Sequence, residues 1–115
     1  MHWDKKGLIF KPDKRLYWSK SHAMIPTPLK LSKDEVKVFY SGRDKLNRSH
    51  IGYVTFDLSK NFKISDKSSV PVLSPGDLGC FDDNGVTPSC AIKVGKKIFL
   101  YYICLLYTSD AADED

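Results

Sequence analysis

Several features are scarce in this chain of 115 residues, and each absence narrows its class. No apolar run approaches the ~18 residues that a membrane-spanning helix needs. No apolar stretch of signal-peptide length follows the first residues, so we expect a cytoplasmic protein. The cysteines number only three, an odd count without CxxC spacing, which favours free thiols over a disulfide framework or a zinc site (Cys80, Cys90 and Cys104).

Helical periodicity is also missing. No segment sustains a 3.6-residue apolar repeat, whereas aromatic residues make up 12% of the chain and lie among Val and Ile, which favours strands. We expect one short strand within residues 1–20 and further strands at 25–31, 36–41, 50–58, 70–73, 86–94 and 97–103. The prolines in the 25–31 and 70–73 strands favour edge positions. Short strands at regular spacing are typical of a sandwich, barrel or propeller.

An internal repeat favours the propeller. A shift of 62 positions places Pro26 on Pro88, and it places Val36, Val38, Phe39 and Tyr40 on Ile98, Leu100, Tyr101 and Tyr102. Both copies contain a proline-bearing strand, a turn and an aromatic-rich strand, and two further strands lie between them. Four antiparallel strands per repeat make one propeller blade. The expected fold is therefore all-β, with about one and a half blades in this chain and the other blades outside it.

The charge is unevenly distributed. The net charge is +4, but residues 104–115 carry four acids and no Lys or Arg, so the remainder carries +8. The lysines are scattered and build no nucleic-acid motif, so a solvated surface is the preferred interpretation. Back-translated, the stretch from Cys104 to Asp113 matches read-through of a transposon-type sequencing adapter. We therefore expect residues 1–103 to be the natural part and residues 104–115 to be a foreign tail; the alternative is a natural, frayed C-terminus.

Several motifs follow one another in a characteristic order. They are WSKSHA at 18–23, FYSGRD at 39–44, NRS at 47–49 and FDDNGV at 81–86. Over residues 3–103 this order resembles bacterial proteins of the five-bladed β-propeller superfamily that contains glycoside hydrolase families 43, 32 and 130, in particular members associated with polysaccharide gene clusters.

The resemblance implies a funnel at the propeller axis, where acidic side chains from different blades meet the sugar. One carboxylate would act as base or nucleophile and another as general acid, with no metal or other cofactor. Phosphorolytic relatives use phosphate in place of water, which requires cationic groups. We expect a carbohydrate substrate, with phosphate as co-substrate in the phosphorolytic case, and neither nucleic acid nor membrane as partner. The fragment alone would be inactive. The alternative is a non-catalytic propeller that binds glycans or assembles polysaccharides.

Three carboxylates are the catalytic candidates. Asp82 and Asp83 lie near the expected start of the second innermost strand, where only one of them would face a ligand. They could instead cap their own backbone in an Asx-turn. Asp44, beside Arg43, could act as acid, base or pKa modulator while the Arg grips hydroxyl groups. A surface ion pair is the alternative.

The substrate-binding candidates complete the set. Ser21 and His22 stand at the start of the first innermost strand, where classical family 43 members carry a catalytic Asp. His22 could bind sugar or phosphate, or act as a base near neutral pH; a structural His is the alternative. Arg48 could contact anions or hydroxyls, and Ser89 lies in the repeat motif beside Pro88. Trp3 and Trp18 could stack on sugars, but packing roles are preferred.

Overall fold

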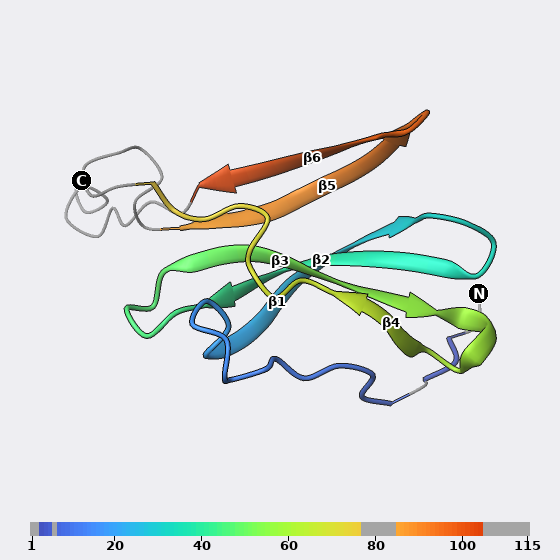
Figure 1. Cartoon of the computed structure of the whole chain (residues 1–115), viewed down its shortest axis with the longest axis horizontal. Coiled ribbons are helices and arrows are strands. Elements are labelled where there is room, and N and C mark those ends of the chain that lie inside the picture. The colour runs from blue at the N-terminus through green and yellow to red at the C-terminus, as the bar shows by residue number, and fades with distance from the viewer. Residues whose placement is uncertain (1–2, 6, 77–84, 105–115) are drawn as a thin grey trace.

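The computed structural model describes residues 3–5, 7–76 and 85–104, and this part of the chain is all-β (Figure 1). Its elements in chain order are β1 (Ser21–Lys30), β2 (Glu35–Arg43), β3 (Ser49–Asp57), a 3-10 turn (Leu58–Lys60), β4 (Lys63–Lys67), β5 (Val86–Val94) and β6 (Lys97–Cys104). The expected all-β class is confirmed. Within the described ranges there is no helix long and apolar enough to cross a membrane.

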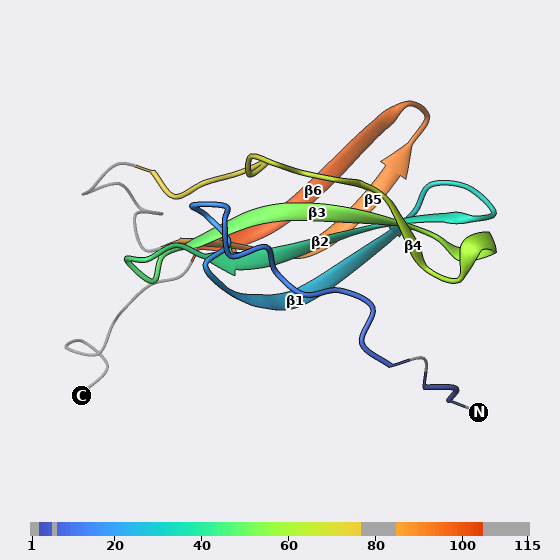
Figure 2. The ribbon, with the colours of Figure 1, turned by 60° about the horizontal axis from the view of Figure 1, so that its bottom comes forward.

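The strands form two antiparallel sheets. The first has the order β1-β2-β3-β4, so each strand pairs with its neighbour in sequence, and the second is the β5-β6 hairpin. The pairing of β2 with β3 runs without interruption from Glu35 opposite Asp57 to Arg43 opposite Ser49. Figures 1 and 2 show the hairpin lying across one face of the first sheet, with the N-terminal segment along the opposite face.

Strand β1 lies at an edge of its sheet, as its prolines predicted. Its pairing with β2 is regular from Thr27 onward but irregular before it, with register shifts between Ser21 and Met24 and between Met24 and Thr27. His22 (φ 65°) and Ile25 (φ 52°) adopt left-handed backbone conformations in this stretch. Such conformations are uncommon for β-branched residues, so the first half of β1 is locally strained.

Both faces of the first sheet carry apolar side chains. Neighbouring residues of a strand point to opposite sides, so the adjacent aromatic residues of β2 contribute one side chain to each face. Tyr40 of β2 packs with Trp18 in one core cluster, which Phe10 of the N-terminal segment covers in part. Phe39 faces the other way and packs with Ile51 in a second cluster beneath the hairpin. The sheet is therefore an inner layer between the N-terminal segment and β5-β6.

Trp18 is the central residue of the first cluster. Its side chain is 0% exposed, and its indole Nε1 donates a hydrogen bond to the Ser69 carbonyl at 3.0 Å. The ring lies against Gly52, where a Cβ atom would be 1.9 Å from Cη2 of the indole. This settles Trp18 as a packing residue, whereas Trp3 is exposed.

Two strand predictions were wrong. The fourth strand is Lys63–Lys67, which is exposed throughout, and residues 70–73 form no strand. Only an isolated bridge joins Leu73 to Ile51, because Pro71 lacks the amide hydrogen that a continuous ladder needs. The short strand expected within residues 1–20 is also absent from the described part of that segment, which forms turns and irregular chain.

Candidate functional site

One end of the first sheet gathers most of the predicted site residues. Ser21 at the start of β1 pairs with Arg43 at the end of β2, and Arg43 pairs with Ser49 at the start of β3. Asp44 and Arg48 lie in the loop between β2 and β3. The structure therefore brings the candidates of residues 21–22, 43–44 and 48 to the same end of the sheet.

Asp44 is held by four hydrogen bonds. Its Oδ1 accepts from the backbone N–H groups of Leu46 and Arg48, both at 2.9 Å. Its Oδ2 accepts from Arg48 Nε at 3.2 Å and His50 Nε2 at 2.8 Å. A carboxylate offers about four acceptor positions, so protein donors occupy those of Asp44. The side chain is 8% exposed and shapes the β2-β3 loop in the manner of an Asx-turn.

Burial raises the pKa of Asp44, but the hydrogen bonds from His50 and the Arg48 amide, together with the positive charge of Arg48, outweigh burial and leave the pKa below its usual value. Asp44 is therefore ionised near neutral pH. An ionised carboxylate whose oxygens already accept four hydrogen bonds is poorly placed to take a proton from water.

His50 is a member of the site that the sequence analysis missed. Its side chain is 4% exposed, and Nε2–H donates to Asp44 while Nδ1 lies 3.0 Å from Ser74 Oγ. In the neutral ring Nδ1 then accepts from the Ser74 hydroxyl, so one tautomer satisfies both bonds. The Tyr17 ring meets His50 edge-on at 6.0 Å. The NRSHI segment places His50 directly after the NRS motif, which was the available signal.

The remaining candidates make fewer contacts. Arg43 Nη1 donates to Asn47 Oδ1 at 3.2 Å, and within the described residues its buried Nε has no hydrogen-bond partner. The surface ion pair between Arg43 and Asp44 that was the alternative interpretation does not form, because Asp44 bonds Arg48 instead. The Ser21 hydroxyl and His22 Nδ1 lie 2.7 Å apart, and the His22 side chain is exposed to solvent.

A serine chain joins the two sheets beneath this end. Ser41 and Ser49 share a hydrogen bond between their buried hydroxyls, and Ser49 Oγ donates to the Val86 carbonyl at 2.7 Å. Gly85 bridges Ser49, where a Cβ atom would lie 2.5 Å from the Ser49 nitrogen. The start of β5 is thus fixed against the start of β3, because a glycine permits this close approach.

Among the described candidates, Ser89 stands apart from this cluster. Ser89 is exposed on β5, between the irregularly paired Pro88 and Cys90, and no described contact connects it with Asp44 or Arg43. Asp82 and Asp83 lie outside the described residues.

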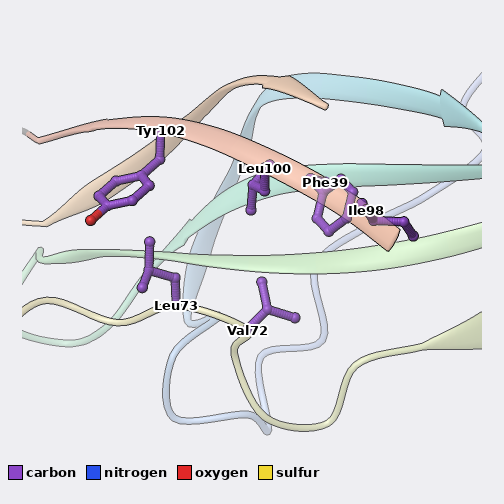
Figure 3. A pocket seen from close by; sticks show the side chains of 6 residues that line it. All are labelled: Phe39, Val72, Leu73, Ile98, Leu100 and Tyr102. Atoms are coloured by element: carbon purple, nitrogen blue, oxygen red, sulfur yellow. The ribbon is translucent and has the colours of Figure 1, made fainter. Parts of the chain in front are cut away.

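Two of the cavities differ in the side chains that line them. A cavity of ≈ 400 Å³ beside Asp44 is lined by polar and charged side chains together with Leu46 (Tyr17, Lys20, Asp44, Lys45, Leu46 and Arg48). A second, of ≈ 340 Å³, lies between the two sheets and is apolar. Figure 3 shows its lining from β2 (Phe39), the segment after β4 (Val72, Leu73) and one face of β6 (Ile98, Leu100, Tyr102). Charged side chains therefore line the first cavity but not the second.

Metal-binding groups do not gather in the described structure. Within residues 3–5, 7–76 and 85–104, no three His, Cys, Asp or Glu side chains are arranged to hold a metal ion. Cys90 and Cys104 are free thiols.

Two curated proteins of Mycobacterium tuberculosis are similar to this chain, "Uncharacterized protein Rv1502" of strain H37Rv and "Uncharacterized protein MT1551" of strain CDC 1551. Each is 44% identical over 102 residues, which is 89% of this chain and 34% of the relative. The chain thus spans about a third of the length of the curated relatives that it matches. No family model matches the chain. No solved structure matches it either.

Proposed function

We propose that this chain is the N-terminal one and a half blades of a five-bladed β-propeller that acts on a glycosidic bond of a bacterial poly- or oligosaccharide, as a hydrolase or phosphorylase. We call the full-length natural protein that carries this segment the parent protein. The catalytic centre of the parent would lie at the propeller axis, near the end of the sheet where Ser21, Arg43 and Asp44 gather.

The orientation of the repeated hairpin carries the fold proposal. Strand β2 begins at Glu35 and β6 at Lys97, a separation of 62 residues, and both hairpins have a register shift beside the matched prolines. Phe39 of β2 faces the hairpin. In β6, Leu100 and Tyr102 face the cavity between the sheets (Figure 3), so Tyr101, the counterpart of Phe39, lies on the opposite face and points away from the first sheet. Each copy therefore presents the same face in the same direction, as stacked blades do.

Burial on both faces supports a propeller over a sandwich. The sheet of an open sandwich has one apolar face and one solvated face, but the first sheet here is apolar on both. The outward face of β6 is apolar as well, and it is exposed in this chain (Phe99, Tyr101 and Ile103). A further blade would cover that face, and the last blade of the ring would complete the cover over the Tyr40 face.

The length of the relatives fits a five-fold ring. A match of 102 residues that covers 34% of a relative corresponds to a relative of about 300 residues. Five blades at a 62-residue repeat would need about the same length. An isolated blade and a half leaves strand edges and apolar faces uncovered, so the fragment should be inactive by itself.

The contacts of Asp44 decide which carboxylates remain candidates for catalysis. Asp44 is occupied by protein donors, so we assign it to positioning and leave Asp82 and Asp83 as the candidate catalytic acids on sequence grounds alone. The same observation favours the alternative function, a non-catalytic glycan-binding propeller, because the described part of the site then supplies hydrogen-bond donors and no free carboxylate.

The test uses the parent protein with a panel of bacterial polysaccharides, with and without inorganic phosphate, and measures released reducing ends. Asp83→Asn or Asp82→Asn should lower the rate by at least about a hundredfold, the usual contribution of a general acid or base. Asp34→Asn, a change of equal charge in the exposed turn between β1 and β2, should leave it unchanged. Binding without release would establish the non-catalytic alternative, and neither binding nor release would overturn both.

A further inference from the structure

The polar cavity beside Asp44 is built from two separate parts of the chain. Tyr17 and Lys20 come from the segment before β1, and the other lining residues come from the loop between β2 and β3 (Asp44, Lys45, Leu46 and Arg48). Lys20 is positioned by the hydrogen bond from its Nζ to the Lys14 carbonyl, at 3.1 Å. With ≈ 400 Å³, the cavity has room for a monosaccharide-sized ligand.

The cavity offers hydrogen-bond donors and positive charge. It has three cationic side chains and one carboxylate. The Asp44 oxygens accept from Leu46, Arg48 and His50, so its acceptor positions are turned to the protein and not to a ligand. Arg48 uses Nε for this bond, and the described residues provide no partner for its two Nη groups. Such a guanidinium can grip a carboxylate or phosphate with paired N–H donors.

Tyr17 adds an aromatic surface at the same place. Its side chain is 59% exposed, yet its ring is supported by the edge-on contact with His50. His50 in turn is fixed between Asp44 and Ser74. An aromatic ring that is held in place and open to solvent provides an apolar platform for the C–H face of a sugar ring at little cost in side-chain entropy.

We propose that this cavity binds a negatively charged saccharide, with its ring on Tyr17 and its carboxylate or phosphate on Lys20, Lys45 and Arg48. This inference rests on the proposed carbohydrate function and adds a substrate class to it. The cavity adjoins the end of the sheet where β1 begins, so a charged sugar unit held there would direct a longer glycan toward the propeller axis.

The test is calorimetric titration of the parent protein with four probes: glucuronate, glucose 6-phosphate, glucose and inorganic phosphate. We expect glucuronate or glucose 6-phosphate to bind at least about tenfold more tightly than glucose, and this preference should shrink in 0.5 M salt because exposed charges are screened. The stronger of the two anionic sugars identifies the acid group. Lys20→Gln and Lys45→Gln should weaken the anionic sugar severalfold each and leave glucose unchanged.

Two further variants separate the parts of the site. Tyr17→Ala should weaken glucuronate and glucose but not inorganic phosphate. Lys63→Gln, which removes the same charge from exposed β4, should change none of the four affinities and is the matched control. Equal affinities for glucuronate, glucose 6-phosphate and glucose, or insensitivity to Lys20→Gln and Lys45→Gln, would overturn the proposal. Phosphate binding with no role for Tyr17 would establish a plain anion site in its place.

These outcomes are independent of the catalytic test. A parent that cleaves neutral glycans but shows no preference for anionic sugars would keep the proposed function and lose this inference. A parent that binds glucuronate through Lys20 and Lys45 without cleaving any polysaccharide would keep the site and lose the catalytic proposal.

Discussion

Gly52→Ala in the parent protein should be strongly destabilising, because the Trp18 ring occupies the space that a side chain would need. A Cβ atom at position 52 would lie 1.9 Å from Cη2, 2.4 Å from Cζ3 and 2.9 Å from Cζ2 of the indole. The ring would have to retreat by roughly 1.5 Å to restore ordinary contacts, yet it is fully buried and hydrogen-bonded to Ser69. Overpacking of this kind typically costs about 1–3 kcal/mol.

A second effect of the substitution partly offsets this loss of stability. Replacing a glycine lowers the entropy of the unfolded chain and stabilises by about 0.4–1 kcal/mol where the backbone allows it. Because three indole atoms would lie within 3 Å of the new Cβ, the overpacking cost should be near the upper end of its range, and we expect a net loss of about 2 kcal/mol. For a parent of about 300 residues, with an unfolding entropy of about 2.1 cal/mol/K per residue, this corresponds to a fall in melting temperature of roughly 3 °C, measured by calorimetry or circular dichroism.

A double-mutant cycle tests the cause. In a Trp18→Phe background the shorter ring should make room, so Gly52→Ala should then cost under about 1 kcal/mol, giving a coupling energy of more than about 1 kcal/mol. Gly95→Ala is the control, since nothing lies within 4 Å of its added Cβ and only its positive φ opposes the change. An equal cost of Gly52→Ala in both backgrounds would refute the reasoning.

Three other changes in the parent protein test the site and the repeat. Asp44→Asn should destabilise by about 1.5–3 kcal/mol at pH 7 through lost charged hydrogen bonds. Because the pKa of Asp44 is lowered in the folded protein, this stabilisation is complete above the ordinary pKa and is lost as the pH falls through the folded value. The urea unfolding free energies of the two proteins should therefore converge in acid, and a constant difference would contradict the prediction. Ser49→Ala should cost about 1–3 kcal/mol by removing the buried hydroxyl that bonds both Ser41 and the Val86 carbonyl, against under about 0.5 kcal/mol for the exposed Ser59→Ala. Tyr101→Ala, at a side chain 56% exposed in this chain, should cost about 3 kcal/mol in the parent, where a further blade would bury it; an effect under about 0.5 kcal/mol would argue against the repeat.

Much of the fold could be predicted because the local signals agree with the tertiary structure. The run from Val36 to Ser41 and the segment from His50 to Phe56 have strong β propensity, and both are central strands. The prolines of β1 correctly predicted an edge. The β5-β6 hairpin was recognisable from Gly95, which has the positive φ that the turn requires.

The errors at β4 and at residues 70–73 have one physical origin. Whether a segment without a clear strand signal becomes a strand depends on the strand that lies beside it. Strand β4 has the sequence KISDK, whose composition is typical of a surface loop, and it becomes a strand because the free edge of β3 lies beside it. Residues 70–73 have the better apolar pattern but carry Pro71, and only one bridge forms. By β propensity alone, residues 70–73 would be the strand and residues 63–67 the loop. The free edge of β3 reverses this order, and propensity takes no account of it.

The sequence was enough to group three of the candidate residues, but not to give their contacts. The spacing of Ser21, Arg43 and Asp44 was enough to bring them to one end of the sheet once the strands were antiparallel. The sequence could not indicate which arginine pairs with Asp44, because Arg43 is its neighbour in the chain and points elsewhere. Arg48 is four residues away and is returned to Asp44 by the loop, with the Asn47 amide hydrogen-bonded to the Asp44 carbonyl at 2.9 Å.

The role of Asp44 limits what a motif can say about catalysis. Within FYSGRD, the position beside an arginine makes this carboxylate a candidate acid or base, but its geometry makes it the organiser of a loop and the fixed partner of His50. The same four bonds that remove Asp44 from proton transfer hold Arg48 and, through His50, Tyr17 at the rim of the cavity. A carboxylate that positions two ligand-binding groups would be as sensitive to mutation as a catalytic one. Asp44→Asn should therefore weaken saccharide binding along with turnover, whereas loss of a true general acid or base would lower turnover and leave binding intact.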